Sequence, residues 1–218
     1  MPLSPPVVAA AIVAALGAVP VPTVAAVQGI IADRLVAVVA GSPIMASDLR
    51  ASRALELVPG AAALDDAALI DRLAVRELMR AEVERFSTTM TDVDPSVAIR
   101  ADAAARIARA GGEAGLAVLG LSPGRLLAWL EDDLRIEHYV RQRFDAASQP
   151  SDDEALTWFQ IHERDYLRDG RPRAFAEVRD EVRARLAAER RQSLIDDWIT
   201  GLRRRAVVVM VPAAGSAP

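Results

Sequence analysis

The sequence predicts a mainly α-helical domain with a small β-sheet formed by an N-terminal hairpin and a C-terminal strand. Beyond residue 46, most apolar residues recur at helical spacing, and aromatic residues make up only 4% of the chain, so the core must consist mostly of Ala, Leu, Val and Ile. Two β-branched runs, 35–40 and 206–211, lie at opposite ends. Because a lone hairpin and a lone strand are each unstable, we expect these runs to pair in one sheet.

The N-terminus carries features of an export signal. Residues 7–19 are continuously apolar, which suits a signal peptide and is too short to span a membrane. Small residues follow, so we expect a signal peptide over 1–26, cleavage after Ala26, no stable membrane span afterwards, and a periplasmic or otherwise exported protein. Residues 1–6 lack the usual Arg or Lys, which leaves an uncleaved anchor or a misassigned start codon as alternatives.

The first elements after the signal follow from β-branched and turn residues. The run LVAVVA at 35–40 predicts a strand, Gly41-Ser42 a turn, and residues 43–46 a short return strand. Ser47 is expected to be the N-cap of the first helix. The chain therefore enters its helical part through a β-hairpin.

Caps and breakers delimit the helices that follow. Ser122 precedes a proline at the first helical position, and Ser151 with Glu154 forms a capping box. The expected helices cover residues 48–58, 66–86, 95–110, 113–119, 123–144, 152–167 and 175–205. We expect one closed domain over 27–211, with an N-terminal part at 33–168 completed by 174–211, and a disordered tail at 212–218.

Composition excludes several classes of function. The chain has no cysteine, which rules out a disulfide framework, a thiol nucleophile and a cysteine zinc site. Its net charge is −4, and its arginines are interleaved with Asp and Glu. A nucleic-acid-binding protein normally concentrates its basic residues on one face, so we expect no nucleic-acid partner.

No catalytic or metal-binding pattern is present in the sequence. His138 and His162 are the only histidines, and no third residue stands at metal-ligand spacing to either one. The paired acids Asp132-Asp133 and Asp196-Asp197 point to different sides of a helix and are expected to be solvated. We therefore expect a protein that is not an enzyme and holds no metal or cofactor.

Four segments resemble the SurA and parvulin-type foldase family, in the order that the family has them. They are DRLVAVVAGSPIMASDL (33–49), GLSPGRLLAWLEDDLRIEHYVRQRF (120–144), SDDEALTWFQIHERDY (151–166) and the helix-and-strand segment 174–209. Family members carry one or two parvulin isomerase domains between the last two segments, where this chain has only residues 167–173. A domain cannot fold from so few residues, so what the resemblance implies is the SurA-like periplasmic chaperone core alone, lacking prolyl isomerase activity.

The resemblance implies a holdase that binds unfolded or extended polypeptides, with outer-membrane protein precursors as clients. Such a chaperone needs exposed apolar surface rimmed by charge. Large adaptable side chains are the candidate peptide-binding residues: Met79, Met90, Trp129, Tyr139, Phe144 and Trp158. One alternative is a structural or adaptor protein of the cell envelope that binds a single dedicated partner, such as a separate isomerase. A residual isomerase is a third reading, which the missing domains disfavour.

Overall fold

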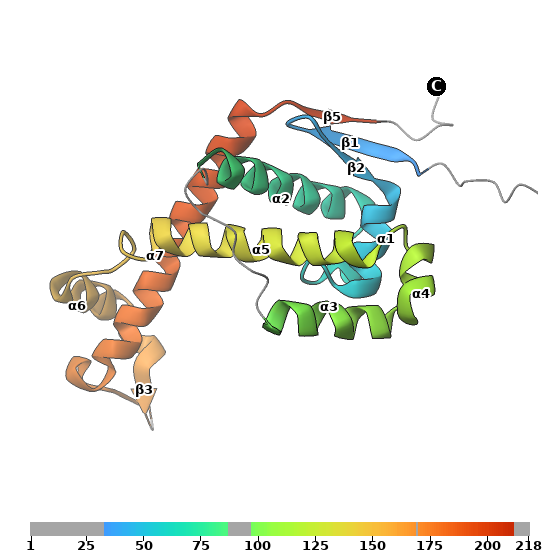
Figure 1. Ribbon diagram of the computed structural model, residues 1–218. Helices are drawn as coiled ribbons and strands as arrows, with labels where there is room; N and C mark the ends of the chain where they lie inside the picture. Colours follow the sequence, from blue (N-terminus) through green and yellow to red (C-terminus); the bar gives the residue numbers. More distant parts are fainter. Residues whose placement is uncertain (1–32, 87–96, 169, 212–218) are drawn as a thin grey trace, which may run out of the picture. The chain divides into compact units, whose positions relative to one another are not determined.

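The computed structural model describes residues 33–86, 97–168 and 170–211, which belong to one compact unit (Figure 1). The fold is mainly α-helical with a small three-stranded sheet, as the sequence predicts. The helices in this part of the chain are α1 (Ala46–Leu55), α2 (Asp66–Phe86), α3 (Val97–Arg109), α4 (Gly112–Val118), α5 (Pro123–Phe144), α6 (Asp152–Ile161) and α7 (Phe175–Arg205), with short 3-10 turns η1 (Ala61–Ala63) and η2 (Glu163–Tyr166). The strands are β1 (Leu35–Val39), β2 (Ser42–Met45), β3 (Leu167–Arg168), β4 (Arg171–Pro172) and β5 (Val208–Met210).

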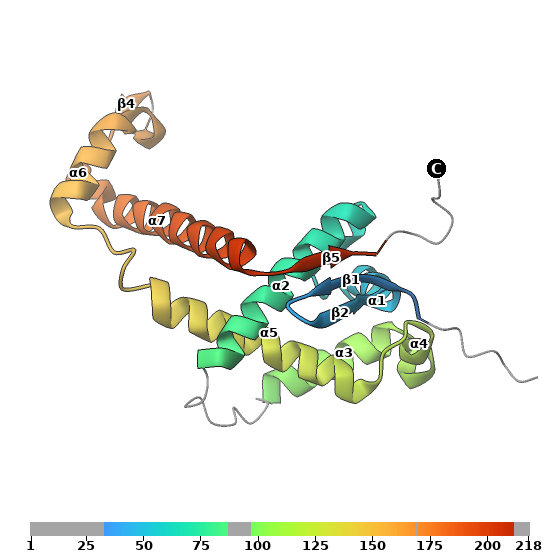
Figure 2. The ribbon, with the colours of Figure 1, turned by 90° about the horizontal axis from the view of Figure 1, so that it is seen from above.

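The main sheet joins the two ends of the described chain. Strand β1 lies between β2 and β5 and pairs antiparallel with both, with Val38 opposite Val209 (Figures 1 and 2). Backbone hydrogen bonds extend the pairing beyond β5: Ala40 N–H donates to the Val207 carbonyl at 3.1 Å, and Val211 N–H donates to the Val36 carbonyl at 3.0 Å. The predicted pairing of 35–40 with 206–211 is confirmed.

Three apolar clusters hold the helices in place. The largest lies between the sheet, α2, α5 and the C-terminal half of α7. A second joins α1, α3, α4 and the first half of α5, so that α5 packs against α2 and α3 (Figure 1). A third joins α6 and η2 to the N-terminal half of α7. The helix α7 therefore connects the third cluster to the first.

The C-terminal half of α7 is fixed to the body by one aromatic residue and two ion pairs. Trp198 is buried, and its ring centroid lies 5.7 Å from those of both Tyr139 and Phe144 on α5. At the end of α7, Arg203 pairs with Asp71 at 2.7 Å and Arg205 pairs with Glu82 at 3.3 Å, both on α2. These contacts place the end of α7 where β5 can reach β1.

The predicted caps are partly confirmed. Ser122 accepts a hydrogen bond from the Arg125 N–H at 3.2 Å, and the capping box of Ser151 and Glu154 is formed. The expected cap at Ser47 is wrong: Met45 is the N-cap of α1, and Ser47 lies buried inside the first turn, where its hydroxyl donates to Asp33. The helix starts earlier because the Asp48 carboxylate accepts from the Met45 N–H at 2.8 Å.

Two further boundaries differ from the prediction. The first helix ends at Leu55 because Glu56 adopts a left-handed backbone conformation. The helix α6 ends at Ile161, and the chain then forms η2 and the two-stranded hairpin of β3 and β4, where a continuous helix to residue 167 was expected. His162 is the C-cap of α6, with a non-helical backbone conformation; its ring stacks on Trp158 with centroids 3.9 Å apart, and its Nδ1 lies 2.8 Å from the Trp158 carbonyl.

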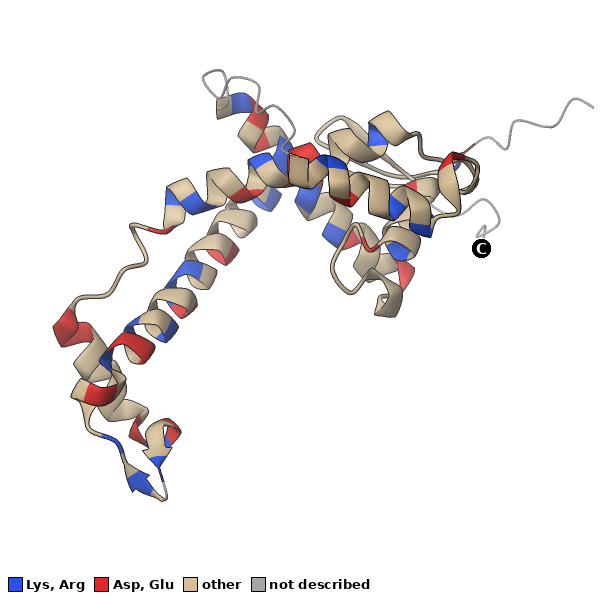
Figure 3. Ribbon diagram, turned by 60° about the horizontal axis from the view of Figure 1, so that its bottom comes forward, with Lys and Arg blue, Asp and Glu red and all other residues tan. Residues whose placement is uncertain are grey.

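Arginines on α7 are interleaved with acids along the helix (Figure 3), and two of them form ion pairs with α6. Arg183 pairs with Asp152 at 2.6 Å, and Arg190 contacts both carboxylate oxygens of Glu154, at 2.8 and 3.1 Å. The hydrogen bonds from Arg190, together with those from Ser151, lower the pKa of Glu154 from 4.5 to about 2. Glu154 therefore stays charged when most carboxyl groups are protonated.

Glu154→Gln is expected to lower the melting temperature at neutral pH, and the difference from wild type should vanish at low pH. A carboxyl group whose pKa is depressed in the folded chain adds stability that is present above its unfolded pKa and is lost as the pH falls through the folded value, here about 2. Circular dichroism melts between pH 7 and pH 2 measure this. Asp153→Asn removes a charge from the same helical turn and is the control. A difference that persisted unchanged at pH 2 would contradict the assignment.

Candidate functional site

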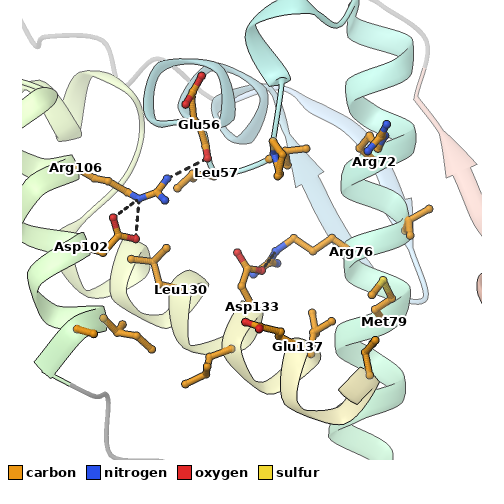
Figure 4. Close-up of a pocket in the computed structure, with 18 of the residues that line it drawn as sticks. Glu56, Leu57, Arg72, Arg76, Met79, Asp102, Arg106, Leu130, Asp133 and Glu137 are labelled. Atoms are coloured by element: carbon orange, nitrogen blue, oxygen red, sulfur yellow. Dashed lines mark hydrogen bonds and ion pairs between the residues drawn. The ribbon is translucent and has the colours of Figure 1, made fainter. Parts of the chain in front are cut away.

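An apolar groove of about 820 Å³ lies between α2, α3 and α5 (Figure 4). Residues 56–59, which follow α1, and Ile195 of α7 complete its lining. This groove is the candidate site. Its lining residues are Glu56, Leu57, Val58, Pro59, Arg72, Val75, Arg76, Met79, Ala98, Ile99, Asp102, Arg106, Leu130, Asp133, Leu134, Ile136, Glu137, Val140 and Ile195.

Most of the lining is apolar because three helices turn part of their apolar faces toward the groove. Leu130 and Ile136 are buried core residues at its base, whereas Val75, Met79 and Leu134 are half-buried. A half-buried apolar side chain at helical spacing can serve the core and a bound partner together. The groove is open along this face, so it offers apolar area to a ligand from outside.

Arg76 of α2 occupies the middle of the groove and is held from several sides. Its Nε donates to Asp133 of α5 at 2.7 Å, its Nη2 donates to the Trp129 carbonyl at 3.0 Å, and its guanidinium carbon lies 3.8 Å from the centre of the Trp129 ring. Its Nη1 contacts Glu77 at 3.0 Å. This network locks α2 to α5 and uses the donors of Arg76 within the protein.

Burial of the Asp133 carboxyl group carries a desolvation cost that its ion pair with Arg76 does not fully offset. Burial raises the pKa of Asp133 above its ordinary value of 3.8, against the lowering effects of Arg76, the largest of which is the charge of its guanidinium. Arg76 is therefore the residue that most opposes this rise in the pKa of Asp133. Sequence reasoning placed Asp133 on a solvated face; its side chain is 36% exposed and ion-paired with Arg76, so that prediction is only partly right.

A second arginine ties the α3 side of the groove to α1. Arg106 donates from Nε to both carboxylate oxygens of Asp102 at 3.1 Å, and from Nη1 to the carbonyls of Leu55 and Glu56 (Figure 4). Those carbonyls belong to the end of α1, and the last carbonyl groups of a helix have no hydrogen-bond partner within the helix. The groove walls are thus held together by charges that neutralise one another, while its surface stays apolar.

The structure distributes the predicted binding residues over several places. Met79 lines the groove, and Trp129 lies behind it under Arg76. Tyr139 and Phe144 pack on Trp198, and Phe144 is only 6% exposed, so it belongs to the core. Trp158 stacks on His162 beside the third cluster, away from the groove lining. Met90 lies outside the described residues.

Sequence reasoning missed Val75, Leu134 and Arg106 as groove residues. The spacing of Val75 and Met79 on one face of α2 was a usable signal. The pairing of Arg76 with Asp133 had none, because it depends on how α2 crosses α5. The groove is therefore a tertiary feature.

The described residues contain no group of three or more His, Asp or Glu side chains that could hold a metal ion. Among the described helices, none combines the length and apolarity needed to cross a membrane. In comparisons with protein-family models, curated proteins and solved structures, nothing matches this chain.

Proposed function

We propose that this protein is a periplasmic-type holdase that binds unfolded exported polypeptides, such as outer-membrane protein precursors, in the groove between α2, α3 and α5. The observation that carries the proposal is the open apolar groove of about 820 Å³. A holdase needs apolar area that is accessible to clients yet does not drive self-association, and charged residues at its edge meet the second requirement. Arg72 and Glu137 are exposed charged residues among those that line this groove.

The chemistry of the groove suits a non-enzymatic role. Arg76 and Arg106 donate hydrogen bonds to Asp133, Asp102 and backbone carbonyls. The groove walls therefore present few polar groups that are placed to bind one particular ligand. Contacts made by area, without such groups, bind many sequences weakly and release them quickly. Strands β3 (Leu167–Arg168) and β4 (Arg171–Pro172) pair directly with each other, which supports a chaperone core that lacks an isomerase domain at this point.

Leu134→Gln is expected to suppress aggregation less well than wild type, because it places an amide in the apolar lining. The protein concentration needed for the same suppression should rise about tenfold. The assay follows light scattering of a chemically denatured, unrelated protein as it is diluted into buffer. Wild type should suppress scattering near stoichiometric ratios.

Val118→Gln is the matched control, since Val118 is 80% exposed on α4 and lies outside the groove lining. It should suppress aggregation like wild type. Circular dichroism melts establish that both variants are folded. If the wild-type protein fails to suppress aggregation of unrelated proteins, the holdase proposal is wrong, and an adaptor with one dedicated partner becomes the better interpretation. Equal activity of Leu134→Gln and wild type would exclude the groove as the binding site.

A further inference from the structure

The edge strand β5 exposes more apolar surface than any other strand of the main sheet. Val207 is 71% exposed, and Val208, Val209 and Met210 are 43%, 51% and 55% exposed. The segment 206–211 contains neither a charged residue nor a proline. Side chains of this kind have high β-propensity, and natural proteins seldom leave them along an open edge.

The hydrogen-bond pattern shows which backbone groups of β5 point outward. Val207 accepts a hydrogen bond from Ala40 and Val211 donates one to Val36, and in an antiparallel ladder every second residue faces the partner strand. Val209 therefore also faces β1. The N–H and C=O groups of Val208 and Met210 point to the opposite edge, where no described strand lies. With respect to the strands of the described residues, four backbone groups are thus available for pairing with a further strand.

The other edge of the same sheet is protected. Strand β2 contains Pro43, and Arg80 of α2 donates a hydrogen bond to the Ser42 hydroxyl at 3.0 Å. A proline and a neighbouring charged side chain are the usual means of blocking an edge strand. The contrast singles out β5 as the edge that is left open for pairing.

We propose that β5 accepts the backbone of an extended, β-forming client segment as a fourth strand of the sheet. This inference rests on the proposed function and specifies its substrate class: segments rich in β-branched or aromatic residues, with free N–H groups at alternate positions. A strand of three residues offers far less contact than the roughly 1,000 Å² that a stable protein–protein interface needs. The edge therefore suits transient capture of an unfolded chain better than a second copy of this protein.

Val208→Pro tests the edge without removing any hydrogen bond of the existing sheet. The Val208 N–H points away from β1, so proline deletes an outward donor and places its ring on the open side. The probe is a labelled peptide of alternating valine and threonine with lysines at both ends, followed by fluorescence anisotropy. Binding should weaken about tenfold or more, which corresponds to about 1.4 kcal/mol. The same peptide carrying N-methyl groups on one edge should lose a similar factor with the wild-type protein.

Val208→Thr is the control, because it keeps the backbone N–H and a β-branched side chain, and it should bind like wild type. If Val208→Pro binds the peptide as well as wild type does, or if wild type does not bind it, the edge proposal is overturned. A wild-type dimer in light scattering that Val208→Pro converts to monomer would also overturn it in favour of a second copy. Aggregation suppression distinguishes client binding in the groove from strand pairing at β5. If Leu134→Gln loses aggregation suppression while Val208→Pro leaves peptide binding unchanged, the groove proposal is supported and the β5 proposal is overturned.

Discussion

Replacing Trp198 by alanine is expected to lower the free energy of unfolding by about 3 to 5 kcal/mol, the range for truncating a buried tryptophan. Trp198 is 8% exposed and touches Tyr139 and Phe144 of α5. Its loss opens a cavity where α7 meets α5. Since β5 follows directly from α7, the main sheet should loosen as well. Urea unfolding followed by circular dichroism measures the change.

Trp198→Phe is the matched control. The Trp198 Nε1 makes no hydrogen bond in the described part of the structure, so phenylalanine loses volume without leaving a polar partner unpaired. We expect it to cost about 1 to 2 kcal/mol, well below the alanine variant. Equal losses for the two variants would show that ring packing does not hold α7 in place.

Arg76→Met is expected to destabilise the fold by about 2 kcal/mol. Breaking a fully buried ion pair costs about 3 to 5 kcal/mol, and the 36% exposure of the Asp133 side chain reduces this. The substitution leaves the Asp133 carboxylate without its cation and the Trp129 carbonyl without its donor. The lost stability should be recovered in part by adding Asp133→Asn, which removes the unpaired charge.

The same variant should show a characteristic dependence on pH. The pKa of Asp133 is already raised by burial, and losing the lowering effect of Arg76 raises it further. A carboxyl group with a raised pKa favours folding below its unfolded pKa and loses that contribution as the pH rises through the folded value. Arg76→Met should therefore approach wild-type stability as the pH falls toward 3.8, as measured by thermal melts. A constant difference between pH 7 and pH 4 would exclude this assignment.

Much of the fold was predictable because its signals are local. The capping box of Ser151 and Glu154 and the Ser122-Pro123 pair mark helix starts within a few residues. The β-branched runs at both ends needed one further argument, that neither is stable alone. The hairpin of β3 and β4 was missed because strands of two residues carry no periodicity.

The candidate site was less predictable. Large side chains at helical spacing indicate apolar faces, but they do not say which part of a face the neighbouring helix covers. Phe144 and Met79 illustrate this: Phe144 is buried against Trp198, whereas Met79 lines the groove. The burial of Phe144 depends on the contact of α7 with α5, which the residues near Phe144 in the sequence do not indicate.

The position of β5 at the end of the chain has a consequence for the order of folding. Strand β1 is synthesised first and its partner β5 last, so these two strands can pair only after nearly every other element has been synthesised. Pairing across such a separation carries the largest loop-closure cost in the fold and should be among its slowest steps. Until β5 pairs, the edge of β1 from Val36 to Val39 is open, and a product truncated before residue 206 would keep this aggregation-prone edge unpaired.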